Sequence, residues 1–441
     1  MYLEAKLAAR AAAKNPVRVC LIGAGKFGSM FLSQVPTTPG LVVSAIADLR
    51  PEAARNTCSA VGWCKDRITV TDFTDDAVAA IGRDDIDVVV EATGQPAAGI
   101  RHARAAFAAG KHIVMVNVEA DVLAGPLLAR EAASSDVVYS MAYGDQPALT
   151  CEQVEWARSC GFSIVAAGKG TKYLPAYHAS TPETVWDHYG LTAEEAAAAG
   201  MNSKMFNSFL DGTKSGLEMA AIANACDLGV PGDGLAFPPC GMDDLAQVLR
   251  PRAEGGQLEA KGQVEVVSSM ERDGRPVARD LRWGVYVVLE AANDYAAACF
   301  RQYGMNTDPT GRYSAMYKPF HLIGLELNVS ILSAGLLGRP TGSTRGFRGD
   351  VAATAKRDLA AGETLDGEGG ATVWGKLIPA ERSLAEARLP IGLAHGVVLK
   401  GPVKAGNMVS WSDIEFDTYD DTIITRRQME QAYSGLKSAT D

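Results

Sequence analysis

Residues 17–28, VRVCLIGAGKFG, decide the fold of the N-terminal part of the chain. Val17–Ile22 is a short, mostly apolar run, which is typical of a buried parallel strand. The glycine-rich stretch GAGKFG follows and opens the helical pattern FGSMFLSQV. In such a strand–turn–helix unit the first glycine permits the turn, the second lets a phosphate approach the backbone, and the third lets helix and strand pack closely. The stretch therefore predicts a dinucleotide pyrophosphate at a helix N-terminus.

The same alternation of strand and helix continues through the first third of the chain. Further apolar strands are predicted at 41–48, 86–91, 113–117 and 137–140, with helical patterns between them. Short apolar strands joined by helices indicate an α/β fold, a doubly wound parallel sheet of the Rossmann type covered on both faces. Asp48 ends the second strand and is predicted to bond a ribose hydroxyl, which favours NAD, whereas Arg50 could instead clamp a 2′-phosphate. The pattern leaves NAD and NADP open.

Polar residues also stand at the ends of the predicted strands at 86–91 and 113–117. Glu91-Ala92-Thr93-Gly94 and Asn117-Val118-Glu119 stand at the carboxyl ends of these strands, which face the ligand crevice in this type of sheet. Ordinary loop polarity is the alternative explanation. The predicted cofactor-binding residues are Gly23, Ala24, Gly25, Lys26, Phe27, Gly28, Asp48, Arg50, Ala92, Thr93, Gly94, Asn117 and Glu119.

Composition narrows the class of protein. The 441 residues carry 42 Lys and Arg against 52 Asp and Glu, a net charge of −10, which argues against a nucleic-acid or anionic-membrane partner. No apolar run reaches about 18 residues, and the first residues contain no secretion signal. The eight cysteines are scattered without a CxxC motif, which favours reduced thiols over a zinc site or a disulfide scaffold. We therefore expect a cytoplasmic protein with no membrane or nucleic-acid partner.

The central part of the chain contains a candidate catalytic helix at 204–225. Five polar residues spaced 3, 4, 3 and 4 apart fall within an arc of about 80° on this helix. Ion pairs on a solvated face would explain this stripe equally simply, but the apolar continuation MAAIANA and two glycines, Gly212 and Gly216, favour a buried helix. A buried stripe of this kind is predicted to form an active site. Its members are Lys204, Asn207, Asp211, Lys214 and Glu218.

Chemical roles follow from these residue types. Lysine can polarise a carbonyl or alkoxide, and a carboxylate at Asp211 or Glu218 can move a proton or hold a divalent cation such as Mg or Mn. Lys169 lies in Gly168-Lys169-Gly170, directly after a predicted strand, and suits phosphate or carboxylate binding. An exposed basic turn is the alternative for Lys169. The predicted catalytic residues are Lys169, Lys204, Asp211, Lys214 and Glu218.

Longer stretches of sequence resemble known families. VRVCLIGAGKFGSMFLSQ, VVVEATGQP and YGDQPALTCEQVEWAR resemble the dinucleotide-binding part of homoserine-dehydrogenase-like oxidoreductases. The tail, AKRDLAAGETLDGEGG and LPIGLAHGVVLKGPVKAGNMVSWSDIEF, resembles a SAF domain, a small β-rich module. Together, over essentially the full length, the chain resembles the 1-deoxy-D-xylulose 5-phosphate reductoisomerase-like family.

This resemblance implies three domains and an activity. The domains would be a Rossmann domain at 1–160, an α+β catalytic domain at 161–338 and the SAF-like domain at 339–441, assembled as a homodimer. The activity would be NADPH-dependent conversion of 1-deoxy-D-xylulose 5-phosphate, a small phosphorylated sugar, to 2-C-methyl-D-erythritol 4-phosphate in isoprenoid precursor synthesis by the methylerythritol phosphate pathway. The family's dinucleotide motif carries over to Gly23, Gly25 and Gly28.

One departure keeps other functions open. Homoserine dehydrogenases proper have a loop resembling Ala-Asn-Lys after the fourth strand, whereas this chain has Asn117-Val118-Glu119. We expect reduction of a sugar-phosphate carbonyl, with Lys169, Lys204 and Lys214 binding the anion and stabilising oxygen. In that mechanism Asp211 and Glu218 would handle protons or a metal. The alternatives are an NAD(P)-dependent dehydrogenase of a hydroxy or amino acid and a dinucleotide-binding sensor without turnover.

Overall fold

The computed structural model describes residues 3–435, which divide into two compact units. Unit 1 comprises the chain up to residue 152 together with 321–345, and unit 2 comprises 153–320 and the chain from 346 onward. The chain therefore leaves unit 1, builds most of unit 2, and returns to unit 1 before its last part. Among residues 3–435, no helix has the length and apolar character needed to cross a bilayer.

Unit 1 is built on a six-stranded parallel sheet with the order β3-β2-β1-β4-β5-β6. This is the strand order of a dinucleotide-binding Rossmann sheet, and it confirms the predicted fold class. The strands are almost entirely apolar because helices cover both faces of a doubly wound sheet. The strands are β1 (Val17–Ile22), β2 (Leu41–Ala47), β3 (Asp72–Thr74), β4 (Val88–Glu91), β5 (His112–Met115) and β6 (Tyr139–Met141).

Helices join the strands of unit 1, and α15 (Asn328–Leu337), from the last third of the sequence, also belongs to this unit. They are α1 (Leu3–Ala12), α2 (Lys26–Gln34), α3 (Pro51–Ala60), α4 (Lys65–Val70), α5 (Ala77–Ile81), α6 (Pro96–Ala108), α7 (Val118–Ser134) and α15 (Asn328–Leu337), while α8 (Gln146–Ser159) crosses the boundary between the units. Helix α15 packs against α1, β1, β4 and β5, and Leu327 and Ile331 join the core that contains Val17. The three-domain division at 160 and 338 stays a prediction. Helix α15 falls within the predicted domain 161–338 but packs in unit 1.

Unit 2 contains one mixed sheet and two small antiparallel sheets. The mixed sheet has the order β10-β9-β7-β8, in which β7 runs parallel to β8 and antiparallel to β9. The C-terminal segment contributes the pair β11–β13 and the sheet β12-β14-β15, in agreement with the β-rich tail expected from the sequence. The strands are β7 (Ser163–Thr171), β8 (Gln263–Ser268), β9 (Val285–Glu290), β10 (Tyr313–Lys318), β11 (Gly349–Ala355), β12 (Thr364–Asp366), β13 (Val373–Pro379), β14 (His395–Leu399) and β15 (Ile414–Glu415).

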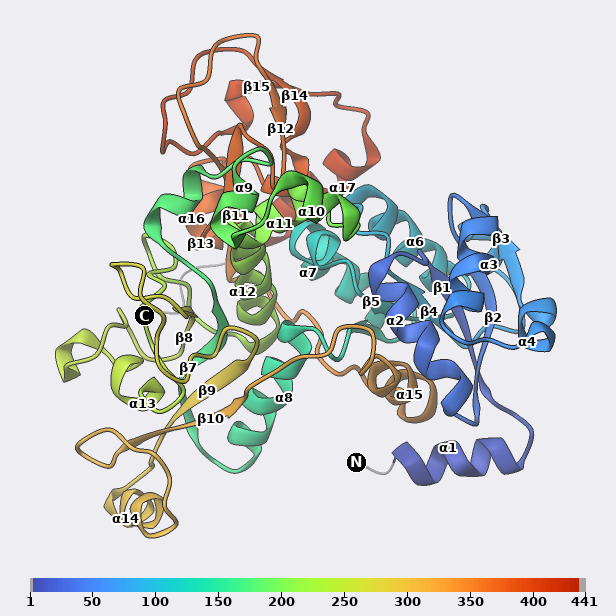
Figure 1. Cartoon of the computed structure of the whole chain (residues 1–441), viewed down its shortest axis with the longest axis horizontal. Coiled ribbons are helices and arrows are strands. Elements are labelled where there is room, and N and C mark those ends of the chain that lie inside the picture. The colour runs from blue at the N-terminus through green and yellow to red at the C-terminus, as the bar shows by residue number, and fades with distance from the viewer. Residues whose placement is uncertain (1–2, 436–441) are drawn as a thin grey trace. The chain divides into compact units, whose positions relative to one another are not determined.

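Helix α12 organises unit 2. Every residue of this helix except Lys214 is buried, and it packs against β11 and β13 as well as β7 and β8 (Figure 1). The helices of unit 2 are α9 (Val185–Tyr189), α10 (Ala193–Ala198), α11 (Ser203–Leu210), α12 (Thr213–Cys226), α13 (Leu245–Val248), α14 (Asp294–Gln302), α16 (Ala380–Ala385) and α17 (Asp421–Tyr433). Short 3-10 helices lie at Val35–Thr37, Pro175–Ala179, Arg252–Glu254, Ile391–Leu393 and Trp411–Asp413.

Candidate functional sites

The glycine loop of unit 1 separates packing requirements from a ligand requirement. Gly23 has a φ of +94°, and a Cβ there would lie 2.7 Å from the Ala92 carbonyl oxygen. A Cβ on Gly28 would lie 2.4 Å from the Gly23 carbonyl oxygen, so both glycines are needed for the fold itself. A Cβ on Gly25 would meet nothing within 4 Å, and its φ of −68° suits any residue. The open space over Gly25, at the uncapped N-terminus of α2, fits the pyrophosphate of a dinucleotide.

The end of β2 distinguishes the two ribose-binding candidates. Both carboxylate oxygens of Asp48 accept backbone hydrogen bonds, at 2.9 Å from the Ala24 N–H and at 2.9 Å from the Arg50 N–H. Asp48 therefore holds the glycine loop against the end of β2. The Arg50 guanidinium is exposed and has no hydrogen bond or ion pair within residues 3–435. A free guanidinium at this place fits an added phosphate group.

The other predicted cofactor residues of the glycine loop, Ala24, Lys26 and Phe27, differ in their exposure to solvent. Lys26 is exposed and is the first residue of α2. Phe27 is half-buried and packs against the core of unit 1, and Ala24 is buried. Of these three residues, only Lys26 presents a charged group to solvent.

Two loops at the carboxyl edge of the sheet are tied to each other. Thr93 Oγ1 donates to the buried Glu91 carboxylate, whose Oε1 lies 3.3 Å from His102 Nδ1. Asn117 caps α7 by accepting from the Ala120 N–H at 3.0 Å and donates to the Gln95 carbonyl at 2.9 Å. The side chain of Asn117 thus holds the loop that contains Ala92, Thr93 and Gly94. Glu119 is half-buried in the first turn of α7.

The stripe predicted on one helix at 204–225 is divided in the structure. The chain forms two helices, α11 and α12, because Gly212 adopts a left-handed φ of +93° and ends the first helix. The prediction of one continuous helix is therefore wrong, since an arc of residues cannot continue through such a turn. Burial separates the stripe residues as well: Asn207, Asp211 and Glu218 are buried, Lys214 is half-buried and Lys204 is exposed.

A buried ion pair joins α12 to the mixed sheet of unit 2. Lys169 on β7 donates to the Glu218 carboxylate, and the two residues are only 6% and 3% exposed. Both were predicted as catalytic, and the structure brings them together. A paired lysine and carboxylate in a dry setting can stabilise a developing oxyanion and hold a proton, at the cost of desolvating both charges.

A second buried ion pair involves a lysine that sequence reasoning missed. Lys356 Nζ lies 2.8 Å from Asp211 Oδ2, and it also donates to the Ser180 carbonyl at 2.6 Å and the Gly370 carbonyl at 2.7 Å. Burial raises the pKa of Asp211, and the charge of Lys356 opposes this effect. Nothing in the local sequence of Lys356 marks it as the partner of a residue in the central part of the chain.

Asp211 also positions a histidine. His178 Nδ1 lies 2.6 Å from the Asp211 carbonyl oxygen, so Nδ1 carries the proton and donates. The other nitrogen, Nε2, then accepts from the Tyr173 hydroxyl at 2.9 Å. Burial lowers the pKa of His178 and keeps the imidazole neutral. The Tyr173–His178 pair can therefore exchange a proton, and the loop rich in Tyr and His at 173–188 was the only sequence signal for it.

Aromatic stacking fixes the orientation of this pair. The His178 ring stacks on Trp374 with centroids 3.8 Å apart, and the Tyr173 ring stacks on Phe237 with centroids 3.9 Å apart. Trp374 lies on β13, so the C-terminal segment of the chain completes the environment of the histidine.

The outer part of the stripe has structural contacts. Lys204 Nζ donates to the Asp366 carbonyl at 3.1 Å. The Asn207 amide donates to three carbonyls, those of Ser180, Gly369 and Gly370. These bonds join α11 to the loop after β12.

The carboxylates do not fit the predicted divalent cation. Within residues 3–435, no three His, Cys, Asp or Glu side chains are grouped closely enough to hold a metal ion. Asp211 and Glu218, the two predicted ligands, each face a lysine ammonium, which competes with a cation for the same oxygens. We therefore assign no catalytic step to a metal.

Two protein-family models match the chain, one over the dinucleotide-binding part and one over the part that follows it. Residues 23–139 match the family model "Homoserine dehydrogenase, NAD binding domain", and residues 144–327 match "Oxidoreductase DRL, catalytic domain". The chain thus has the parts of an NAD(P)-dependent oxidoreductase: a nicotinamide dinucleotide-binding domain followed by an oxidoreductase catalytic domain. No curated protein matches the chain.

The solved structures that match the chain do so at low identity and low TM-score. A 3-ketoreductase from Actinomadura kijaniata, KijD10, in complex with NADP is 20% identical, with 36% of this chain and 50% of that chain covered and a TM-score of 0.27. A putative myo-inositol dehydrogenase from Sinorhizobium meliloti is 13% identical, with coverage of 73% and 90% and a TM-score of 0.36. The myo-inositol dehydrogenase from Lactobacillus casei, in complex with NAD(H) and myo-inositol, is 14% identical, with coverage of 62% and 71% and a TM-score of 0.34.

Proposed function

We propose that this chain is an NADP-dependent oxidoreductase that interconverts a carbonyl and a hydroxyl group of a small polar substrate. One observation carries the cofactor assignment. At the end of β2, both oxygens of Asp48 are bonded to the backbone, while the Arg50 guanidinium is free. An occupied carboxylate and a free guanidinium favour the 2′-phosphate of NADP over the 2′-hydroxyl of NAD.

Residues of unit 1 would hold the cofactor. The N-terminus of α2 and the open face of Gly25 would receive the pyrophosphate, and Arg50 would bind the adenosine phosphate. Asp48 would keep the glycine loop in place. The nicotinamide, when bound, supplies or accepts a hydride.

Residues of unit 2 would handle the proton and the oxygen. Lys169, held by Glu218, would stabilise negative charge on the substrate oxygen, and the hydrogen bond to Glu218 would fix the position of the ammonium. The Tyr173–His178 pair would give or take a proton at the Tyr173 hydroxyl. Asp211 would act as a positioning residue, because its carbonyl orients His178 and its carboxylate binds Lys356. Lys204 and Lys214 would bind an anionic group of the substrate.

Two substrate classes fit this outline. The NAD-binding domain match supports a dehydrogenase of a hydroxy or amino acid. The catalytic-domain match over 144–327 covers most of the predicted catalytic domain, where the resemblance implies reductoisomerisation of 1-deoxy-D-xylulose 5-phosphate. The homodimer and the SAF-like role of the C-terminal segment belong to this second proposal.

A substrate assay separates these functions. The full chain would be incubated with NADPH and 1-deoxy-D-xylulose 5-phosphate, and in parallel with NADP⁺ and unphosphorylated hydroxy acids, amino alcohols or polyols. Nicotinamide absorbance and product identification would be followed with and without a divalent cation. Oxidation of NADPH with formation of a methylerythritol phosphate supports the reductoisomerase. Reduction of NADP⁺ by an unphosphorylated substrate supports the dehydrogenase. Cofactor binding without turnover on any substrate would support the sensor and overturn the enzymatic proposal.

A further inference from the structure

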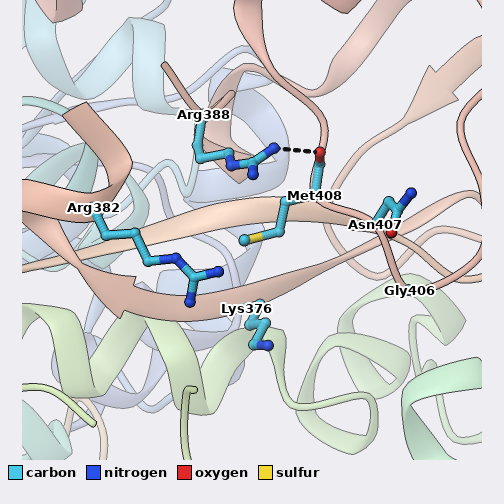
Figure 2. A pocket seen from close by; sticks show the side chains of 6 residues that line it. All are labelled: Lys376, Arg382, Arg388, Gly406, Asn407 and Met408. Carbon is cyan, nitrogen blue, oxygen red and sulfur yellow. Dashed lines mark hydrogen bonds between the residues drawn. The ribbon is translucent and has the colours of Figure 1, made fainter. Parts of the chain in front are cut away.

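A basic hollow lies in unit 2 and is built by the C-terminal segment. It has a volume of about 400 Å³ and is lined by Lys376, Arg382, Arg388, Gly406, Asn407 and Met408 (Figure 2). This size is at the lower end of the roughly 300–1,000 Å³ that small-molecule sites occupy. No predicted catalytic or cofactor residue lines it.

Local structure explains how the basic residues meet. Lys376 lies on β13, Arg382 lies on α16, which follows β13 directly, and Arg388 follows the end of α16. The loop at 406–408 comes from later in the chain, and Arg388 Nη1 donates to the Met408 carbonyl at 2.9 Å (Figure 2). Figure 2 shows the three basic side chains arranged around the Met408 side chain.

A single carboxylate fixes both arginines without neutralising the hollow. Glu386 accepts from Arg382 Nε at 3.0 Å and from Arg388 Nε at 2.8 Å. Two of the three cationic side chains, Arg382 and Arg388, therefore share one carboxylate, and Lys376 has none in the described part of the chain. Asp233 is nearly fully exposed, and its carboxylate is 4.0 Å from Arg382 Nη1. The hollow keeps excess positive charge on a chain whose net charge is −10.

Several donors in the hollow have no protein partner. Within residues 3–435, the Lys376 ammonium makes no hydrogen bond or ion pair, and neither does the side-chain amide of Asn407. Arg382 uses Nε for Glu386 and Nη1 for the Gly232 carbonyl, which leaves its Nη2 group available. A prealigned guanidinium beside an ammonium and an amide is suited to the several oxygens of one phosphate group.

We propose that this hollow binds the phosphate group of a small phosphate monoester, with Lys376 and Arg382 as the principal contacts and Asn407 as a further donor. Arg388 shapes the wall through its bonds to Glu386 and Met408. The phosphate can belong either to the substrate of the proposed oxidoreductase or to a separate ligand. The proposal concerns binding and stands apart from turnover.

The test is calorimetric titration of the full chain with glycerol 3-phosphate, with glycerol as the matched probe that lacks the phosphate. We expect saturable binding of the phosphate ester only, weakened by added salt because the interaction is between charges. Lys376→Gln should weaken binding at least tenfold. Arg382→Lys keeps the charge but removes the planar fork, and it should also weaken binding. Lys400→Gln changes the same charge at an exposed position outside the hollow and should bind like the wild type.

The outcomes separate the proposal from the proposed function. Failure to saturate with the phosphate ester, or equal binding by wild type, Lys376→Gln and Arg382→Lys, overturns it. An equal loss in Lys400→Gln also overturns it, because the effect would then reflect overall charge. If Lys376→Gln raises KM for a phosphorylated substrate, the hollow holds the substrate's phosphate. If it weakens glycerol 3-phosphate binding but leaves KM unchanged, the hollow holds a second ligand. Both results support the site. If the protein shows no activity, the calorimetric binding test still decides the proposal, because it does not depend on turnover.

Discussion

Lys356 and Asp211 form an ion pair in the interior of unit 2, with Nζ and Oδ2 2.8 Å apart and both side chains at most 2% exposed. The pair connects the segment after β11 to the turn between α11 and α12. The same turn orients His178 through the Asp211 carbonyl. Contact between the C-terminal segment and the central part of the chain is therefore built into the surroundings of the proposed proton-transfer pair.

Removal of Lys356 should destabilise the protein. In Lys356→Met, the Asp211 carboxylate would stay buried without its cation, which costs about 3–5 kcal/mol when one partner of a buried pair is lost. Urea unfolding of wild type and variant measures the difference. Lys404→Met is the matched control, because Lys404 pairs with Asp358 in an exposed ion pair and should contribute little. Equal stability of wild type and Lys356→Met would show that the pair does not hold the two segments together.

Two glycine substitutions should separate folding from cofactor binding. Gly25→Ala places a methyl group in open space and should leave the free energy of unfolding within about 0.5 kcal/mol of wild type, while weakening NADPH binding about tenfold or more. Gly28→Ala places a methyl group against the Gly23 carbonyl and should destabilise the fold by about 1–3 kcal/mol. Urea unfolding and NADPH fluorescence titration distinguish the two effects. Unchanged NADPH affinity in Gly25→Ala would place the pyrophosphate elsewhere.

Arg50 should determine the choice between the two nicotinamide dinucleotides. Arg50→Ala removes the free guanidinium and should weaken NADPH binding about tenfold while leaving NADH binding unchanged, because only NADPH carries the 2′-phosphate. Fluorescence titration with each cofactor measures this selectivity. Arg55→Ala, on the next turn of α3, is a suitable control since its charge already lies near Glu52. Equal losses for NADPH and NADH would assign Arg50 a structural role.

A buried carboxyl in unit 1 should make stability depend on pH. Burial raises the pKa of Asp121 to about 6, although the hydroxyls of Tyr139 and Thr344 donate to it and oppose the shift. Because the folded-state pKa lies above the unfolded value, the protonated group stabilises the fold below about pH 4, and this contribution is lost as pH rises through about 6.

The substitution Asp121→Asn removes this titration but keeps an oxygen that can accept from Tyr139. Between about pH 4 and pH 7, the variant should gain about 3 kcal/mol of stability relative to wild type, as measured by urea unfolding at each pH. Asp75→Asn, at an exposed position of unit 1, should show no such change. A parallel pH dependence of Asp121→Asn and wild type would contradict the raised pKa.

Substitutions in the proposed catalytic group should lower activity more than stability. Glu218→Gln keeps the shape of the side chain but removes the charge that holds Lys169, and kcat/KM should fall at least a hundredfold. Lys214→Ala should raise KM for an anionic substrate. Steady-state kinetics alongside urea unfolding test both variants. If Glu218→Gln and Lys214→Ala both leave kcat/KM within about threefold of wild type, these residues take no part in the reaction.

The sequence predicted the Rossmann unit well because its signals are local. Each strand of the parallel sheet is buried on both faces and therefore appears as a continuous apolar run, and the three glycines are constrained within one strand–turn–helix unit. The spacing argument for the 204–225 stripe was less successful. It identified Asp211 and Glu218 as buried, but Gly212 adopts a left-handed turn that no helical periodicity reveals.

The sequence by itself determined the type of the N-terminal sheet, the place of the dinucleotide loop and the burial of α12. Only the tertiary structure decided which charges meet: Lys169 with Glu218, Lys356 with Asp211, and three basic residues around one hollow. The reason is physical. An apolar run or a glycine turn is specified by neighbours along the chain. The sequence around a lysine, in contrast, does not show whether its side chain is exposed or buried. Its partner is set by packing between segments that lie far apart in the sequence.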